Sequence, residues 1–250
     1  MSLSTARIGA VIRKEMTEFR RSRFIVSTMA IMPVIFLVAP TVSILARGSA
    51  AAGPKLGTVI GYSLLYLLLI PVFIPSVIAA YSVVGEREQG TLEPLLTTPI
   101  RREELLIGKA TAMFIPAIGL GYLVFGVFVT IVRLGANPVV ASAVWHSPVL
   151  IAEVFFIPLL AGWAIWIGIA VSSKASEIRV AQQLGTLASL PALGVTALFT
   201  FQVISPSLPL AVALAGALLV IDGLACFLVA RLFDRERLIT GTGQGARLAN

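Results

Sequence analysis

The stretch from residue 85 to residue 109 reads GEREQGTLEPLLTTPIRREELLIGK and separates two long apolar runs. Five of the chain's 12 acidic residues fall between Glu86 and Glu104. A charge cluster this dense lies outside the hydrocarbon of a membrane, because charged side chains are costly inside it. The stretch and its flanks therefore predict membrane-spanning helices joined by a polar segment that a soluble protein can contact.

Within this stretch, the residue order predicts a short helix of about two turns. Thr91 is a suitable helix cap, since its hydroxyl can accept a hydrogen bond from a backbone N–H of the first turn. Glu93 and Pro94 both suit that first turn, the acid because of the helix dipole and the proline because its missing N–H costs little there. Pro99 disfavours helix at the preceding residue and ends the element. One side of this helix carries Leu92, Leu95 and Leu96.

The motif Glu86-Arg87-Glu88-x-Gly90-Thr91-Leu92-Glu93-x-Leu95-Leu96-x-Thr98-Pro99 resembles the cytoplasmic signature of type-2 ABC exporter permeases. In that family the segment between the second and third spans docks onto a separate ATP-hydrolysing subunit. Residues 85–109 are called the coupling segment below. The resemblance implies that the ATPase-coupling residues are Glu86, Arg87, Glu88, Gly90, Thr91, Leu92, Glu93, Leu95, Leu96 and Pro99.

The composition is that of a membrane protein. Of the 250 residues, 58% are hydrophobic and 12% are charged, with a mean hydropathy of +0.97, whereas roughly 25% of residues are charged in ordinary soluble domains. The net charge of +7 is explained by the excess of Lys and Arg on the cytoplasmic side of membrane proteins. Nucleic acid is therefore not an expected partner.

The apolar runs predict a single all-α transmembrane domain over residues 1–250 with six spans. The second run is longer than a ~30 Å hydrocarbon core requires, and its Pro71 and Pro75 make a kink plausible. Residues 4–23 form an amphipathic helix whose basic side suits the membrane lipid surface, and the family resemblance implies that it is an elbow helix that helps to seat the ATPase. The spans are expected at about 24–45, 57–84, 110–132, 149–171, 184–201 and 210–232.

The distribution of basic residues predicts the topology. Sixteen of the 19 Lys and Arg residues lie in the leader, the coupling segment, the connection between the fourth and fifth spans, and the end of the chain. The three others lie in the alternate connections. This bias places both termini and the coupling segment in the cytoplasm.

A few further residues are candidates for function, each with an ordinary structural alternative. Asp222 lies in the middle of the sixth span, where an acid either serves a substrate pathway or makes a structural hydrogen bond. Trp163 and Trp166, three residues apart in the fourth span, either line that pathway or pack against neighbouring helices. The resemblance implies that Lys174 and Glu177 form a second cytoplasmic contact with the ATPase, and the structural alternative for Glu177 is to cap a helix.

The sequence contains no recognisable set of catalytic residues. The sequence contains no GxxxxGK[ST] phosphate loop, no Ser/His/Asp set and no cluster of metal ligands, and it has one cysteine, Cys226, and one histidine, His146. We therefore expect no catalytic residue, metal or cofactor in this chain, with ATP and Mg²⁺ bound by a partner P-loop ATPase.

These observations favour the permease subunit of an ATP-driven exporter in a prokaryotic inner membrane. The resemblance implies a dimer, with itself or with a similar chain, and two ATPase copies. One alternative is a membrane assembly or signalling subunit that binds a soluble protein through the coupling segment without transporting anything. Another is an ion-coupled carrier that depends on Asp222.

Overall fold

The computed structural model describes residues 3–46, 55–90, 100–200 and 208–232, and all regular secondary structure within them is helical. The helices are α1 (Thr5–Arg21), α2 (Arg23–Leu45), α3 (Lys55–Ala80), the π-helix η2 (Tyr81–Gly85), α4 (Glu86–Glu88), α6 (Arg102–Gly135), α7 (Pro138–Trp145), α8 (Pro148–Lys174), α9 (Ile178–Thr200) and α10 (Leu208–Leu232). The expected all-α architecture is confirmed for these residues.

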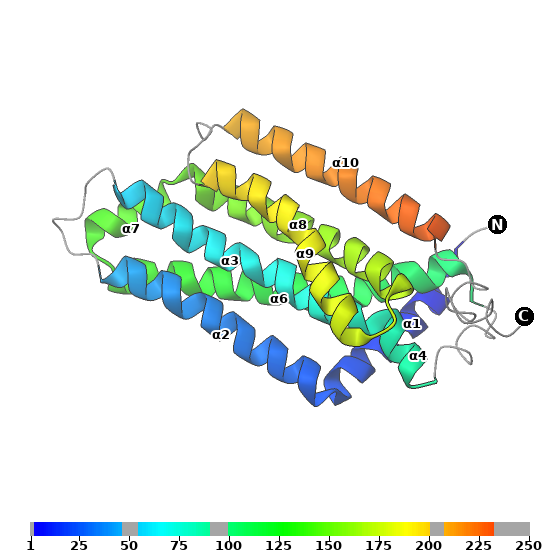
Figure 1. Ribbon diagram of the computed structural model, residues 1–250. Helices are drawn as coiled ribbons and strands as arrows, with labels where there is room; N and C mark the ends of the chain where they lie inside the picture. Colours follow the sequence, from blue (N-terminus) through cyan, green and yellow to red (C-terminus); the bar gives the residue numbers. More distant parts are fainter. Residues whose placement is uncertain (1–2, 47–54, 91–99, 201–207, 233–250) are drawn as a thin grey trace, which may run out of the picture.

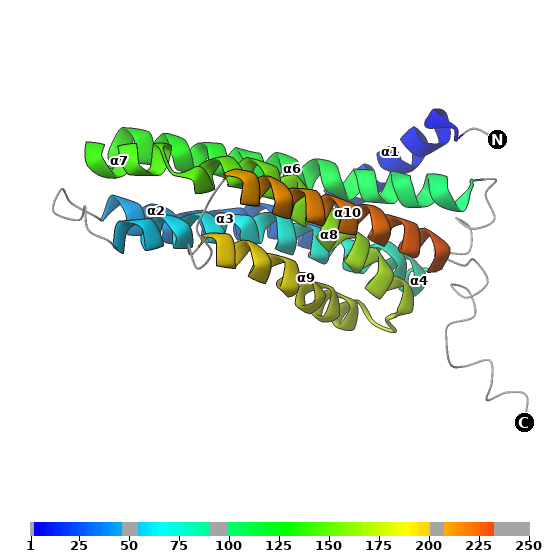
Figure 2. The ribbon, with the colours of Figure 1, turned by 90° about the horizontal axis from the view of Figure 1, so that it is seen from above.

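The long helices form one bundle with α3 at its centre. α3 packs against α2, α6, α8 and α9, whereas α10 packs mainly on α8 (Figures 1 and 2). Small residues bring α3 and α8 very close, since a Cβ added at Gly168 would lie 2.4 Å from the Cβ of Ala79. Such close approach through glycine and alanine is typical of helix contacts inside membranes.

Five of the described helices are long and apolar enough to cross a membrane, namely those over Arg23–Leu45, Leu56–Glu88, Arg102–Gly135, Pro148–Lys174 and Val212–Arg231. The expected fifth span corresponds to α9, a helix of 23 residues that is not among these five. Its first turns contain Arg179, Gln182 and Gln183, which lower its apolar content. The sixth crossing therefore stays a prediction.

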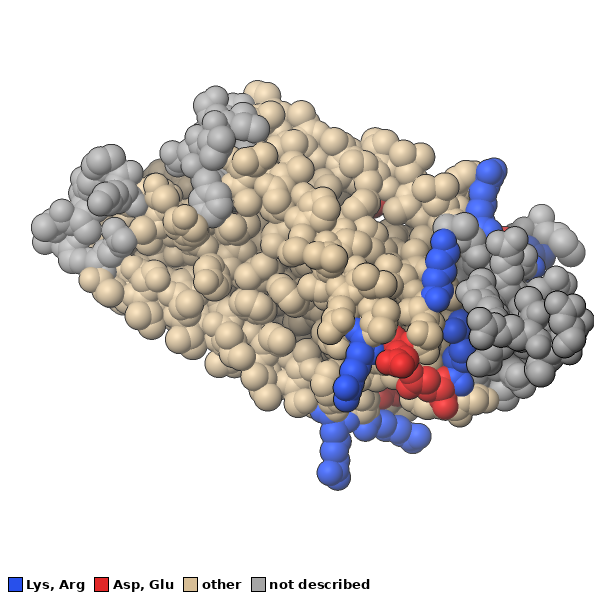
Figure 3. Space-filling model, in the orientation of Figure 1, with Lys and Arg blue, Asp and Glu red and all other residues tan. Residues whose placement is uncertain are grey.

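Charged side chains gather at one end of the bundle. Figure 3 shows most of the visible Lys, Arg, Asp and Glu at the end that carries α1 and α4, and almost entirely uncharged residues over the rest of the described surface in that view. The opposite end carries α7, where the guanidinium of Arg133 lies over the ring of Trp145, 5.5 Å from its centroid. The two ends of the bundle thus differ in charge as the distribution of basic residues predicts.

Local capping explains an early helix start and an additional short helix that the expected spans do not include. α6 begins at Arg102, eight residues before the expected span, because the Glu104 carboxylate accepts a hydrogen bond from the Arg101 N–H at 3.1 Å and caps the helix start. The polar stretch expected after the third span contains α7, in which the Asn137 side chain accepts from the Val139 N–H and Pro138 takes the first helical position.

Candidate functional site

The structure describes the two ends of the coupling segment, residues 85–90 and 100–109. Thr91, Leu92, Glu93, Leu95, Leu96 and Pro99, predicted as coupling residues, lie outside the described residues. The site that can be built is therefore the base that holds this segment against the bundle. Gly90 ends the first described part with φ of +68°, a backbone conformation in which a glycine avoids strain.

The segment begins at the π-helix η2, which continues α3. In a π-helix the backbone hydrogen bonds skip one residue further than in an α-helix, so neighbouring backbone groups take other partners. Ser172 of α8 supplies them: its hydroxyl donates to the Ala80 carbonyl at 2.9 Å, and its oxygen accepts from the N–H groups of Val83 and Val84 at 3.2 Å each. One buried hydroxyl thus holds this turn.

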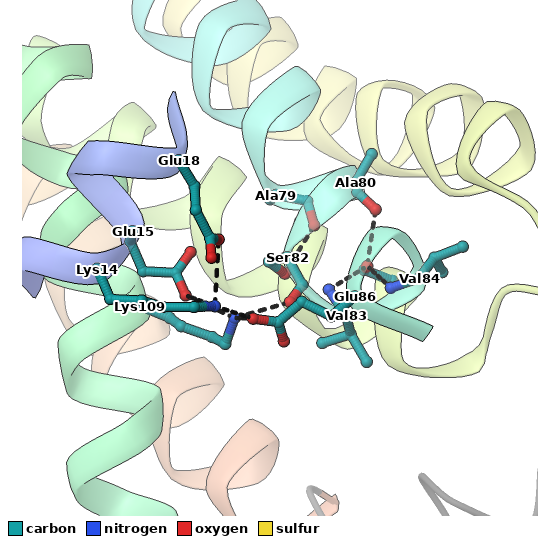
Figure 4. A network of polar contacts seen from close by, with 11 residues as sticks. Lys14, Glu15, Glu18, Ala79, Ala80, Ser82, Val83, Val84, Glu86 and Lys109 are labelled. Carbon is teal, nitrogen blue, oxygen red and sulfur yellow. Dashed lines mark hydrogen bonds and ion pairs between the residues drawn. The ribbon is translucent and has the colours of Figure 1, made fainter. Parts of the chain in front are cut away.

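Lys109, at the other end of the segment, is completely buried and points toward the same turn (Figure 4). Its ammonium group donates to the Ser82 carbonyl at 2.8 Å. It also lies 2.9 Å from a carboxylate oxygen of Glu15 and 2.9 Å from one of Glu86. Lys109 therefore joins three elements: α1, the turn after α3, and its own helix α6.

Lys14 completes this cluster from α1. Its ammonium group contacts Glu86 and lies 3.2 Å from Glu15 and 3.1 Å from Glu18. Burial alone would lower the pKa of Lys14, but attraction to Glu15 and Glu86 outweighs it and raises the pKa, so this side chain stays protonated. Lys14, Glu15, Glu18, Glu86 and Lys109 are called the ion cluster below.

The ion cluster brings three carboxylates, those of Glu15, Glu18 and Glu86, close enough together to hold a metal ion. The ammonium groups of Lys14 and Lys109 already contact these carboxylates, and their two charges match those of the two buried acids, Glu15 and Glu86. A structural ion pair network explains the arrangement, because buried charges are stable only when they are paired.

A second anchor holds the start of α1 on α6. The buried Glu104 carboxylate accepts from the Ser4 N–H at 2.8 Å and lies 3.0 Å from the Arg7 guanidinium. Gly108 allows the two helices to touch, since a Cβ there would lie 2.7 Å from the Cβ of Val11. α1 is thus fixed along its length to the helix that leaves the coupling segment.

Arg87 and Glu88, both predicted as coupling residues, bind the connection between α8 and α9. The Arg87 guanidinium donates to the carbonyls of Ala175 at 3.1 Å and Ser173 at 3.3 Å. The Glu88 carboxylate accepts from the Ile178 N–H at 3.3 Å, at the start of α9. The structure therefore brings the coupling segment and the predicted second contact together.

In that connection, Lys174 and Glu177 are both exposed. The Glu177 carbonyl accepts from the Ala181 N–H at 3.0 Å, which places Glu177 at the beginning of α9. Their exposure leaves them accessible to a soluble protein, and their role as a contact stays a prediction.

The predicted pathway residues lie apart from the ion cluster, within the bundle. Asp222 of α10 lies against Gly162 of α8, and Asp222 and Trp166 line one cavity between α6, α8 and α10. Trp163 packs against a neighbouring apolar cluster, and its indole N–H has no partner among the described residues. The structure thus joins Asp222 with Trp166 but does not add Trp163 to that cavity.

Apart from Glu86, no member of the ion cluster was predicted from the sequence, although one signal for the cluster was present. Glu15 lies four residues after Val11 and four before Phe19, both of which are buried. Residues four apart share a helix face, so Glu15 belongs to the face that packs on the bundle. A buried acid on that face requires a cation, and Lys109 supplies it.

The sequence was compared with models of known protein families to find which family contains this site. The sequence model of the ABC-2 family transporter proteins matches residues 11–182. This chain belongs to the ABC-2 transporter family. The match runs from the middle of α1 into α9, so it includes every member of the ion cluster and Ser172. The comparison with curated proteins gives no match.

Membership of the ABC-2 transporter family makes this chain a membrane permease subunit of an ABC transporter. Membrane subunits of the ABC-2 family generally pair with an ATPase subunit. A multi-pass membrane protein is also what the five long apolar helices indicate.

Proposed function

We propose that this chain is the permease of an ABC exporter and that the coupling segment is the place where its ATPase docks. The observation that carries the proposal is the anchoring of both described ends of that segment. One end is bound by Ser172, Arg87 and Glu88 to α8 and α9, and the other is bound through Lys109 to α1.

This anchoring suits the transmission of movement. A force applied to the segment between residues 90 and 100 reaches α3 and α6 directly, because these helices continue from its two ends. Through the ion cluster and Ser172 the same force reaches α1 and α8. ATP binding by the partner would therefore move several helices together rather than distort one loop.

The rest of the proposal follows from the distribution of charge and from the family. The charged end of the bundle faces the cytoplasm of a prokaryotic cell, both termini lie there, and α9 completes six spans. α1 lies as an elbow helix at the lipid surface. Two permease subunits, identical or similar, enclose the substrate pathway and bind two ATPases that hold ATP and Mg²⁺.

The test is purification of the tagged chain in mild detergent from its native cells, followed by identification of the proteins that come with it. We expect a P-loop ATPase in stoichiometric amount. Leu95→Glu should remove the ATPase while the variant still inserts in the membrane, because a charge replaces an apolar contact. Leu134→Glu is the matched control, since Leu134 is 82% exposed at the opposite end of the bundle.

Each result has a clear reading. Retention of the ATPase by Leu95→Glu would show that docking occurs elsewhere. Recovery of a different soluble protein, with no ATPase, would favour the assembly or signalling role, because that role also uses the coupling segment.

A further inference from the structure

Two adjoining cavities lie along the seam between α8 and α10. The first has a volume of about 360 Å³ and the second about 430 Å³. Both are lined by Pro158, Leu159 and Leu219, so they meet at these residues, and the two together are called the groove below. It follows α8 from Ile151 to Trp166, a distance of roughly 22 Å at 1.5 Å per residue.

The groove has an apolar end and an acidic end. The first cavity is lined by apolar side chains together with one glycine, and Phe155 and Val212 are among them. The second cavity adds Trp166 and Asp222. A molecule that fills this groove is therefore hydrophobic along most of its length and meets a carboxylate at one end.

Asp222 is held in this position by the helix opposite. A Cβ added at Gly162 would lie 2.9 Å from Asp222 Oδ2, so the glycine allows the carboxylate to rest against α8. Asp222 Oδ1 is buried and accepts no hydrogen bond from any described residue. No Lys or Arg of the described residues forms an ion pair with it. A carboxyl group inside a membrane span is costly without such a partner.

We infer that this groove binds a hydrophobic organic cation, with its positive group against Asp222 and its apolar body along Pro158, Leu159 and Leu219. Three observations favour this occupant. The positive group supplies the partner that Asp222 lacks. Trp166 in the same cavity offers an aromatic face to a cation. The two cavities together have the size of sites that hold drug-sized ligands, about 300–1,000 Å³.

The assignment of this molecule as the transported substrate rests on the proposed exporter function, whereas its binding does not. Binding is therefore tested on the purified permease alone, in nanodiscs of phosphatidylcholine and without ATPase or ATP. The probe is tetraphenylphosphonium, and triphenylphosphine oxide serves as a neutral probe of similar chemistry. Equilibrium dialysis gives the affinity of each.

We expect the wild type to bind tetraphenylphosphonium at least about tenfold more tightly than the neutral probe. Asp222→Asn should remove this preference and leave binding of the neutral probe unchanged. Glu153→Gln is the control, because Glu153 is a buried acid on α8 that is not among the residues lining the groove.

A second pair of variants does not depend on the acid. Leu219→Trp fills the shared part of the groove and should weaken binding of both probes at least tenfold. Leu224→Trp, on the same helix at a residue 57% exposed and outside the groove, should bind both as the wild type does. Thermal unfolding of each variant checks that it is folded.

The inference is overturned if the wild type shows no preference for the cation, or if Leu219→Trp binds both probes normally. It is also overturned if a second copy of the chain covers the groove. In that case neither probe binds, and Leu219→Trp changes the mass of the particle. The probe can bind as expected while vesicles that hold permease and ATPase do not transport it. In that case the groove is confirmed as a binding site, and the bound molecule is not a substrate that this permease exports.

Discussion

Replacing Lys109 with methionine keeps much of the length of this side chain but removes its charge from the ion cluster. The variant leaves Glu15 and Glu86, both nearly fully buried, with Lys14 as their remaining cation in that cluster. Removing one partner of a buried ion pair typically costs about 3–5 kcal/mol, because the other charge is left buried and uncompensated. Since Lys14 still contacts both acids, we expect the lower end of that range, about 3 kcal/mol.

A loss of about 3 kcal/mol corresponds to a decrease in Tm of roughly 6–12 °C for a chain of this size. The assay is thermal unfolding of the purified permease in detergent. The quantity measured is the fraction of protein that stays monodisperse after heating to each temperature. Arg20→Met is the matched control, because Arg20 is an exposed basic residue of α1. Substitutions of exposed residues usually change stability by less than about 0.5 kcal/mol.

The double variant Lys109→Met with Glu15→Gln gives the decisive comparison. It removes one positive and one negative charge, so the net charge of the cluster returns to that of the wild type, and we expect it to recover more than half of the lost stability. If the two single losses simply add, or if Lys109→Met unfolds like the wild type, then Lys109 and Glu15 are not coupled and the reasoning is wrong.

Two further substitutions test the packing around the coupling segment. Ser172→Ala should destabilise the protein by about 1–3 kcal/mol, because it leaves buried backbone groups of the π-helix without a partner. Ser173→Ala is the control: the Ser173 hydroxyl bonds only within its own helix, so the change in stability should stay within about 0.5 kcal/mol. Equal stability of the two variants would contradict the role of Ser172. Gly108→Val should separate α1 from α6 by collision with Val11 and expose α1 to limited proteolysis. Gly119→Val on the same helix is the control, because a Cβ at Gly119 would meet no atom within 4 Å, and resistance of Gly108→Val to cleavage would show that α1 and α6 are not in close contact.

The long apolar runs could be predicted as helices from sequence because a membrane leaves the backbone few alternatives. The ends of the helices were predicted less accurately. The first turns of α6 and the last residues of α8 are polar, so the apolar runs do not include them. Pro71 and Pro75 lie inside α3, and the kink expected there stays a prediction. The π-helix at Tyr81–Gly85 was not expected from the sequence.

The candidate site was predictable only in part. The resemblance identified Glu86, Arg87 and Glu88, and the structure shows these side chains bound to the bundle. The partnership of Lys109 with Glu15 joins residues 94 positions apart, and it depends on how α1 lies across α6. That placement is decided by tertiary packing at Gly108, which no local pattern indicates.

The ion cluster also has a consequence for biosynthesis. Its acids and its cations come from three separate helices, and Lys109 is the last of them to leave the ribosome. Before Lys109 emerges, Glu15 and Glu86 have only Lys14 as a cation within the cluster, and α6, against which α1 packs, is not yet complete. At roughly 5–20 residues per second, this interval lasts on the order of seconds, during which the first two spans lack the contacts that Lys109 makes in the finished bundle.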